Sequence, residues 1–241
     1  MVTKSLINQI HNLKQKKFRQ KTGLFVAEGE KLIQELLKAN FKYSMLLTTE
    51  INSNFSTLII TKKQMKKLTH FKTASNYIGV FYKPQYHFDI NGEYESVLVL
   101  DGISDPGNLG TIIRTCDWYG ISDIVCSKET VDCYNSKVVQ SSMGSISRVR
   151  CHYADIIPFL KTSKLQKLGA TLEGESIYNS NLNKNTIFVF GNESKGISIE
   201  VKSFLDNLIT IPKYRKSQNI DSLNVAASVA VILGERFRQI I

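Results

Sequence analysis

Short apolar runs and helical apolar stripes alternate along most of this chain. Residues 4–21 carry apolar side chains near helical spacing, and lysines crowd the later turns of that stretch; this pattern predicts one basic amphipathic helix. A short buried strand is expected over 24–27, and the apolar face of 31–39 predicts a helix that ends at Asn40. Further elements fit strands over 45–48, 58–60 and 77–81 and a capped helix over 61–68. The first 83 residues therefore predict a small α/β domain.

A change of pattern follows this domain. Residues 84–96 have the composition of a linker, with proline, asparagine, glycine and little apolar periodicity. Strand and helix then alternate: we expect strands over 97–100, 124–126, 149–153, 169–172, 187–190 and 208–211, and helices over 107–119, 136–143, 156–160 and from Ser222 to about Arg238. This alternation predicts an α/β domain over 97–241, a mostly parallel sheet with helices on both faces. Ligands of such sheets bind in the loops beyond the carboxyl ends of the strands.

The composition is that of an ordinary globular protein, with 42% hydrophobic and 22% charged residues. No apolar stretch approaches the ~18 residues of a membrane-spanning helix, and the first residues mix polar side chains into the apolar positions, unlike a signal peptide. We therefore expect a cytoplasmic protein with no membrane contact. The four cysteines form no CxxC pair and have no histidine at metal-site spacing, so we expect reduced thiols and no metal.

The positive charge of the chain is concentrated in its first part. The net charge is +10; residues 1–95 hold 15 Lys and Arg against 7 Asp and Glu, whereas residues 96–241 hold 16 against 14. This concentration of positive charge favours binding of a polyanion, because lysines and arginines release the counterions condensed on a phosphate backbone. A solvated lysine-rich surface without a partner is the alternative interpretation.

Three segments that follow expected strands depart from ordinary loop sequence. Segment 101–114 combines three glycines and a proline with Asn108 and Arg114, and segment 191–196 is a polar turn bounded by glycines. Segment 211–228 holds Ser222 as the expected helix cap and Asn224 in the expected first turn. Glycines let a ligand approach main-chain N–H and C=O groups. The glycine spacing does not match GxGxxG, and no GxxxxGK[ST] occurs, so dinucleotide and P-loop sites lose their main support.

In this order, the three segments resemble the motifs of the SpoU branch of the SPOUT RNA methyltransferases. The matching stretches are Asp105-Pro-Gly-Asn-Leu-Gly110 with Arg114, Gly191-Asn-Glu-Ser-Lys-Gly196, and Ile211-Pro212 with Ser222-Leu-Asn-Val-Ala226. Residues 25–33 resemble, less specifically, the ribosomal-protein-like substrate-binding extension of many SpoU rRNA methyltransferases. The third motif departs from the family: Lys213-Tyr-Arg-Lys216 replaces a methionine and a glycine, and the path to Ser222 is longer. For the tract 213–221 we expect at most a basic RNA contact.

The resemblance implies an S-adenosylmethionine-dependent 2′-O-ribose methyltransferase of RNA that acts as a homodimer and has a deep trefoil knot in its C-terminal domain. The implied cofactor contacts are Leu172, Gly191, Asn192, Ile211 and Leu223. The implied catalytic positions are Arg114 and, around it, Asn108, Glu193, Ser222 and Asn224. A guanidinium stays protonated, since its pKa lies above about 12. We therefore expect Arg114 to position the ribose or its phosphate and to stabilise negative charge developing on the oxygen.

The identity of the substrate stays open at this point. The N-terminal extension favours ribosomal RNA by analogy, and transfer RNA is the alternative. A non-catalytic RNA-binding protein on the same fold is a second alternative, against which the complete set of polar motif residues argues. A nucleotide-dependent oxidoreductase is disfavoured because its glycine fingerprint is missing.

Overall fold

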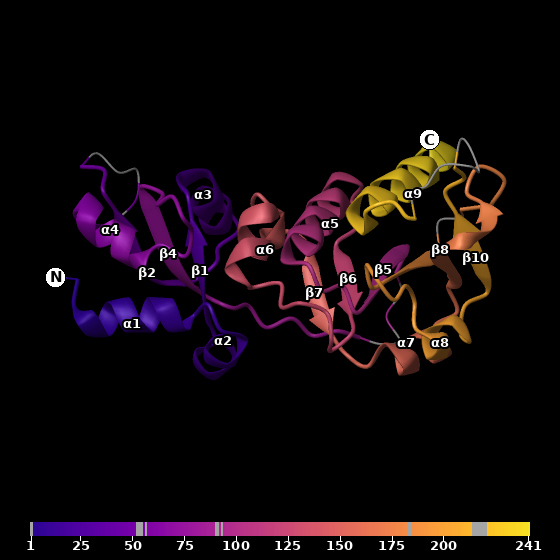
Figure 1. Ribbon diagram of the computed structural model, residues 1–241, viewed down its shortest axis with the longest axis horizontal. Helices are drawn as coiled ribbons and strands as arrows, with labels where there is room; N and C mark the ends of the chain where they lie inside the picture. The colour runs from indigo at the N-terminus through magenta and orange to yellow at the C-terminus, as the bar shows by residue number, and fades with distance from the viewer. Residues whose placement is uncertain are drawn as a thin grey trace. The chain divides into compact units, whose positions relative to one another are not determined.

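The computed structural model describes residues 2–51, 55, 57–89, 92, 94–182, 185–213 and 221–241, and Figure 1 shows the elements in chain order. The chain divides into two compact units. The first comprises Met1–Gln85 and Asp132–Arg148, and the second comprises Tyr86–Val131 and Val149–Ile241. Each unit has its own sheet.

The first unit is built on a four-stranded sheet in the order β1-β4-β2-β3. Its strands are β1 (Leu24–Glu28), β2 (Tyr43–Thr48), β3 (Leu58–Ile59) and β4 (Tyr77–Tyr82). Its helices are α1 (Lys4–Asn12), α2 (Lys16–Thr22), α3 (Glu30–Lys38), α4 (Lys62–Leu68) and α6 (Ser136–Ser141), and a 3-10 turn, η1, spans Ser145–Ser147. β4 pairs antiparallel with β1 and β2, whereas β3 pairs parallel with β2. This small α/β arrangement follows the expected elements closely.

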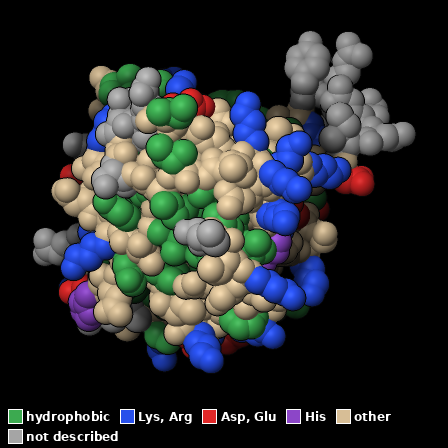
Figure 2. Space-filling model, turned by 90° about the vertical axis from the view of Figure 1, so that its left-hand side faces the viewer, with side chains coloured by type: hydrophobic (Ala, Val, Ile, Leu, Met, Phe, Trp, Pro, Cys, Tyr) green, Lys and Arg blue, Asp and Glu red, His purple; other side chains and the backbone are tan. Residues whose placement is uncertain are grey.

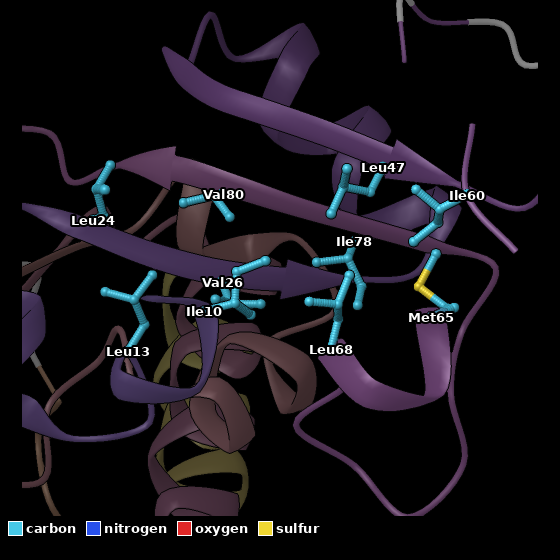
Figure 3. Close-up of a cluster of buried hydrophobic side chains, with 10 residues drawn as sticks. All are labelled: Ile10, Leu13, Leu24, Val26, Leu47, Ile60, Met65, Leu68, Ile78 and Val80. Carbon is cyan, nitrogen blue, oxygen red and sulfur yellow. The ribbon is translucent and has the colours of Figure 1, made fainter. Parts of the chain in front are cut away.

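Alternate residues of these strands form an apolar core with the helices. Figure 3 shows side chains of β1, β2 and β4 meeting side chains of α1 and α4 and of the segments beside them. The cluster contains Ile10, Leu13, Leu24, Val26, Leu47, Ile60, Met65, Leu68, Ile78 and Val80, all of them buried. The period of two along β1 and β4 is what a strand with one face on this core requires. The capping box of Thr61 and Gln64 begins α4 as expected.

The stretch expected as one helix over 4–21 is two helices, α1 and α2, with a break at residues 13–15. The guanidinium of Arg19 is 2% exposed and donates to the carbonyl oxygens of Leu13 and Lys14, each at 2.8 Å. In a continuous helix these carbonyls would accept from main-chain amides four residues later. Arg19 also pairs with Asp132 at 2.7 Å, so a contact distant in sequence holds the break.

Segment 132–148 lies between two strands of the second unit along the chain, yet it packs into the first unit. The rings of Phe25 and Tyr134 are 4.8 Å apart, and Nδ1 of His70 lies 2.5 Å from Oγ of Ser136. Sequence order had placed this segment in the C-terminal domain. Part of the expected linker likewise belongs to the second unit, where the ring of Phe88 packs 5.3 Å from that of Phe159.

The second unit is built on a six-stranded sheet in the order β10-β8-β9-β5-β6-β7. Its strands are β5 (Ser96–Asp101), β6 (Asp123–Cys126), β7 (Arg150–Tyr153), β8 (Gln166–Ser176), β9 (Thr186–Gly191) and β10 (Asn207–Thr210). Every neighbouring pair is parallel, which confirms the predicted parallel α/β fold. Figure 1 shows α5 (Pro106–Trp118) and α9 (Val225–Ile240) on one side of this sheet and α7 (Ile156–Thr162) and α8 (Ile199–Lys202) on the other.

One helix boundary differs from expectation at a position that matters for the site. α9 begins at Val225, and its N-cap is Asn224, whose Oδ1 accepts from the amides of Ala226 and Ala227 at 2.9 and 3.4 Å. Ser222, the expected cap, precedes the helix and is exposed. The cap prediction was therefore wrong by two residues, because either side chain is a suitable N-cap and local sequence does not choose between them.

The described part of the chain contains no helix long and apolar enough to cross a membrane. Within the same residues, no cluster of three or more His, Cys, Asp or Glu side chains could hold a metal ion. All four cysteines are free thiols. Complete burial raises the pKa of the Cys116 thiol, so this cysteine serves as a small apolar core residue.

Candidate active site

The three unusual segments meet at one edge of the second sheet. β10, β8, β9 and β5 are successive neighbours and all run parallel, so the residues that follow them emerge at the same edge. The segments at 101–105 and 191–196 leave β5 and β9, which pair directly. Residues 211–213 leave β10. The topology therefore brings together loops that lie up to 110 residues apart in sequence.

The turn after β9 is closed by main-chain and side-chain hydrogen bonds. Asn192 and Gly196 exchange two main-chain bonds of 3.0 and 2.9 Å, and Oδ1 of Asn192 accepts from the amides of Ser194 and Lys195. Nδ2 of Asn192 donates to the carbonyl of Gly102 at 2.7 Å, which joins this turn to the loop after β5. A Cβ added to Gly191 would lie 2.1 Å from the carbonyl carbon of Gly196. Only glycine fits at position 191.

Glu193 projects from this turn into the loop after β5. Its Oε2 accepts from the amide and the hydroxyl of Ser104 at 3.2 and 2.9 Å. Its Oε1 accepts from the amide of Asp105 at 3.1 Å and from Nδ2 of Asn108 at 2.9 Å. Oε2 also accepts a longer bond of 3.4 Å from Nδ2 of Asn192, so one carboxylate organises both its own turn and a loop 88 residues away in sequence.

Burial alone would raise the pKa of Glu193, but the hydrogen bonds from Asn108 and from main-chain amides outweigh burial and lower it to about 2. The carboxylate is therefore ionised at neutral pH and acts only as an acceptor. Such a group is a poor proton acceptor for a ribose hydroxyl, because a general base works best with a pKa near the working pH. Its chemistry is to hold Asn108 and the loop in place.

The ionised carboxylate fixes the orientation of two neighbouring amides. Asn108 must present Nδ2 to Glu193, so its Oδ1 faces outward and accepts from Nδ2 of Asn224 at 2.9 Å. The Oδ1 of Asn224 is then left for the amides at the start of α9, where it is the N-cap. In this chain of hydrogen bonds, Asn224 donates to Asn108 and Asn108 donates to Glu193. The start of α9 fixes the orientation of the amide at one end, and the carboxylate fixes it at the other. The chain Asn224–Asn108–Glu193 joins all three motif segments.

Two further predicted catalytic positions stay outside this network. Arg114 lies on α5, the helix that carries Asn108, with an exposed side chain. It forms no hydrogen bond or ion pair with another residue that the structure describes, and the same holds for exposed Ser222. A free guanidinium on the same helix as the fixed Asn108 is available to a ribose or a phosphate. The basic tract after Lys213 lies outside the described residues over 214–220.

The predicted cofactor positions follow neighbouring strands. Gly191 ends β9, Ile211 directly follows β10, and Leu172 lies where β8 departs from its pairing with β10. This departure brings the carbonyl of Leu172 within 3.1 Å of the hydroxyl of Thr210. Leu172 and Leu223 are large apolar side chains that are 65% and 52% exposed. Main-chain polar groups beside exposed leucines suit a ligand with an aromatic base and a polar amino-acid end, as S-adenosylmethionine has.

Ser104 is a site residue that sequence reasoning missed. Its amide and hydroxyl both donate to Glu193, so it contributes two of the five hydrogen bonds that fix the carboxylate. Its position directly before the Asp105–Gly110 motif was the available signal. Asp101 also joins two of these segments. Its Oδ2 accepts from the amide of Ser198 at 2.8 Å, which ties β5 to the residues after the β9 turn.

Comparisons with known proteins agree with this geometry. The model of the SpoU rRNA Methylase family matches residues 95–234, and the model of the MRM3-like substrate binding domain matches residues 4–79. The chain is 27% identical over 229 residues, covering 90% of each chain, to the 23S rRNA (guanosine(2553)-2′-O)-methyltransferase RlmP of Bacillus subtilis (strain 168).

Solved structures give the same result over almost the whole chain. A putative RNA methyltransferase of the TrmH family from Porphyromonas gingivalis has a TM-score of 0.87 and 30% identity, with 99% of each chain covered. An AdoMet-bound rRNA methyltransferase from Sinorhizobium meliloti has a TM-score of 0.87 and 28% identity, covering 100% of this chain and 97% of that one. With its three motif segments joined at one sheet edge, this chain belongs to the SpoU rRNA methylase family.

Proposed function

We propose that this protein transfers a methyl group from S-adenosylmethionine to a ribose 2′-hydroxyl of ribosomal RNA. The observation that carries the proposal is the Asn224–Asn108–Glu193 chain, which joins the three motif segments in one fixed arrangement. The named activity of the Bacillus subtilis relative, a 23S rRNA 2′-O-methyltransferase, supports ribosomal RNA as the substrate class. The AdoMet-bound Sinorhizobium meliloti structure supports the cofactor.

S-adenosylmethionine supplies a methyl group on a positively charged sulfur. We assign its binding to Leu172, Gly191, Asn192, Ile211 and Leu223. The exposed leucines would flank its base, and main-chain groups beside these residues would bond its polar parts. Methyl transfer is a displacement, so alignment of the 2′-oxygen supplies most of the help that the protein can give.

The catalytic residues serve that alignment. Arg114 binds the ribose or its adjoining phosphate and stabilises negative charge on the 2′-oxygen as its proton leaves to water or phosphate. Ser222 and Asn224 orient the substrate from the segment before α9, and Asn108 orients it from α5. Glu193 keeps Asn108 in one orientation.

Three larger features belong to the same proposal. We assign RNA binding to residues 1–83, a linker to 84–96 and the methyltransferase domain to 97–241, a division that the matched ranges 4–79 and 95–234 support. Segment 132–148 packs into the first unit although it lies within 97–241, and the assigned linker belongs to the second unit from Tyr86 onward. We propose a deep trefoil knot and a homodimer by resemblance to the family, and a cytoplasmic location.

The test uses radiolabelled S-adenosylmethionine with separate ribosomal and transfer RNA from cells that lack this protein. We expect label in ribosomal RNA, recovered as a 2′-O-methylnucleoside. Arg114→Ala should reduce the rate at least ~10²-fold. Arg114→Lys should also be slow, because lysine keeps the charge but loses the planar fork. Label in transfer RNA alone would overturn the assigned substrate, and RNA binding without any label would indicate the non-catalytic alternative.

A further inference from the structure

The first unit contains an open hollow of about 510 Å³ lined by Leu37, Asn40, Phe41, Lys42, Tyr43 and Tyr82. Its volume lies in the ~300–1,000 Å³ range of sites that hold small molecules. Five of these six residues lie within the range, 4–79, that matches the MRM3-like substrate binding domain. The lining of the hollow comes from the end of α3, the start of β2 and the end of β4. These ends lie side by side because β2 and β4 pair antiparallel, with Tyr43 opposite Phe81.

The end of α3 gives the hollow a rigid rim. Asn40 has a left-handed φ of 60°, the amide of Asn40 donates to the carbonyl of Leu37, and the amide of Phe41 donates to the carbonyl of Leu36. These two bonds and the left-handed residue define a Schellman motif, which ends a helix sharply. The carbonyl of Lys42 accepts from the amide of Tyr82 at 2.9 Å, which ties the rim to β4. The backbone around the hollow is therefore well held.

Buried aromatic rings support the exposed rings from behind. The ring of Phe41 packs edge-on at 6.3 Å from that of Phe25, and the ring of Tyr43 packs edge-on at 6.3 Å from that of Phe81. Phe25 and Phe81 are fully buried and stack at 5.8 Å on each other. Aromatic pairs in these geometries stabilise one another beyond simple burial. The rings of Phe41 and Tyr43 are therefore held from behind before any ligand arrives.

The hollow combines exposed aromatic surface with positive charge. Tyr43 is 43% exposed and Tyr82 is 47% exposed, which is a large apolar area to leave in water. Of the six lining residues, Lys42 alone is charged. The nearest acidic side chain on α3, Glu35, is held by Lys38 at 3.3 Å and by Arg148 at 2.7 Å. The space-filling view in Figure 2 shows basic side chains gathered along one side of the face it presents, beside apolar ones.

We propose that this hollow binds an unpaired nucleobase of the RNA substrate, with the base against Tyr43 and Tyr82 and the ammonium of Lys42 on an adjoining phosphate. Aromatic side chains stack on any base, and a lysine beside them bonds the backbone, which is how proteins hold single-stranded RNA. The excess of positive charge over residues 1–95 favours a polyanion such as RNA over an uncharged partner surface. The inference rests on the proposed function only in taking RNA as the substrate.

The experiment measures binding of the full chain to a fluorescent single-stranded RNA of about ten nucleotides. The double variant Tyr43→Ala/Tyr82→Ala should bind about 5- to 100-fold more weakly, whereas Tyr43→Phe/Tyr82→Phe should bind almost as well, since phenylalanine keeps the ring. Lys42→Gln should lower the dependence of log affinity on log salt by about one. Tyr178→Ala removes a tyrosine of the second unit that is still more exposed, at 57%, and serves as the control.

A second measurement covers the case in which the alanine variant fails to fold. Irradiation of the unaltered protein with RNA that carries 5-iodouracil should cross-link Tyr43 or Tyr82, identified by mass spectrometry. Equal binding by the folded alanine and control variants, or cross-links only elsewhere, would overturn the assignment. Methyl transfer is assayed on the same preparations. If the protein methylates RNA but the hollow neither affects binding nor cross-links, the base-binding site is rejected and the proposed function stands. If RNA cross-links at the hollow but no methyl group is transferred, the proposed function is rejected and the base-binding site stands.

Discussion

Replacement of Glu193 by glutamine tests whether this carboxylate organises the site. Oε1 accepts from the amide of Asp105 and from Nδ2 of Asn108, and Oε2 accepts from the amide and hydroxyl of Ser104 and, at 3.4 Å, from Nδ2 of Asn192. Whichever oxygen becomes the amide nitrogen, two N–H donors lose their acceptor, whereas the Ser104 hydroxyl can rotate to accept. A hydrogen bond to a charged group contributes about 1.5–3 kcal/mol, so the upper limit is about 3–6 kcal/mol. Because Glu193 is only half-buried, water replaces part of the lost hydrogen bonding. We therefore expect the free energy of unfolding to fall by about 2–3 kcal/mol.

Two assays check this estimate. A loss of 2–3 kcal/mol should lower the melting temperature by about 4–12 °C in a domain of this size. Single-turnover methyl transfer should slow by about 10²-fold, because Asn108 loses its fixed orientation. Glu129→Gln is the control, since Glu129 is exposed and forms no hydrogen bond with another described residue. If Glu193→Gln melted within about a degree of the parent protein and methylated RNA normally, the carboxylate would not be the organising group.

Three further predictions concern stability. The pKa values of Glu193 and Asp123 are both lowered to about 2 despite burial, by hydrogen bonds that favour the charged forms. The stability that these two carboxylates give the folded protein is therefore complete above about pH 5 and should disappear as the pH falls towards 2. The Glu193→Gln variant should lose less stability over this pH range, because it lacks one of the two carboxylates. Gly191→Ala should destabilise by at least about 2 kcal/mol in thermal unfolding and impair cofactor binding in calorimetry, because its Cβ would overlap main-chain atoms; near-normal values for both would contradict the steric argument. Arg19→Met should cost about 3–5 kcal/mol in denaturant unfolding by leaving Asp132 buried without its partner, and Asp132→Asn in that background should recover part of the loss. No recovery in the double variant would mean that the loss comes from other contacts of Arg19.

Local sequence determined much of this protein. The alternation of strand and helix after residue 96 predicted the parallel sheet, because buried parallel strands read as short apolar runs. It follows that loops after such strands share one edge, so the sequence also indicated where Asn108, Glu193 and Asn224 would lie. The structure brings these three into contact. Asn40 likewise ends α3 as expected, since asparagine tolerates the left-handed conformation there.

Only the tertiary structure decided the features that depend on distant partners. The break between α1 and α2 follows from Arg19 meeting Asp132, 113 residues away. Segment 132–148 joins the first unit through this pair and through contacts such as those of Tyr134 and Ser136. Asn224 caps α9 because its other amide atom is held by Asn108, whereas Ser222 has no such contact among the described residues. Periodicity reports which face of an element is apolar, but not what that face meets. Pairings over long sequence separations are therefore determined by the folded chain as a whole.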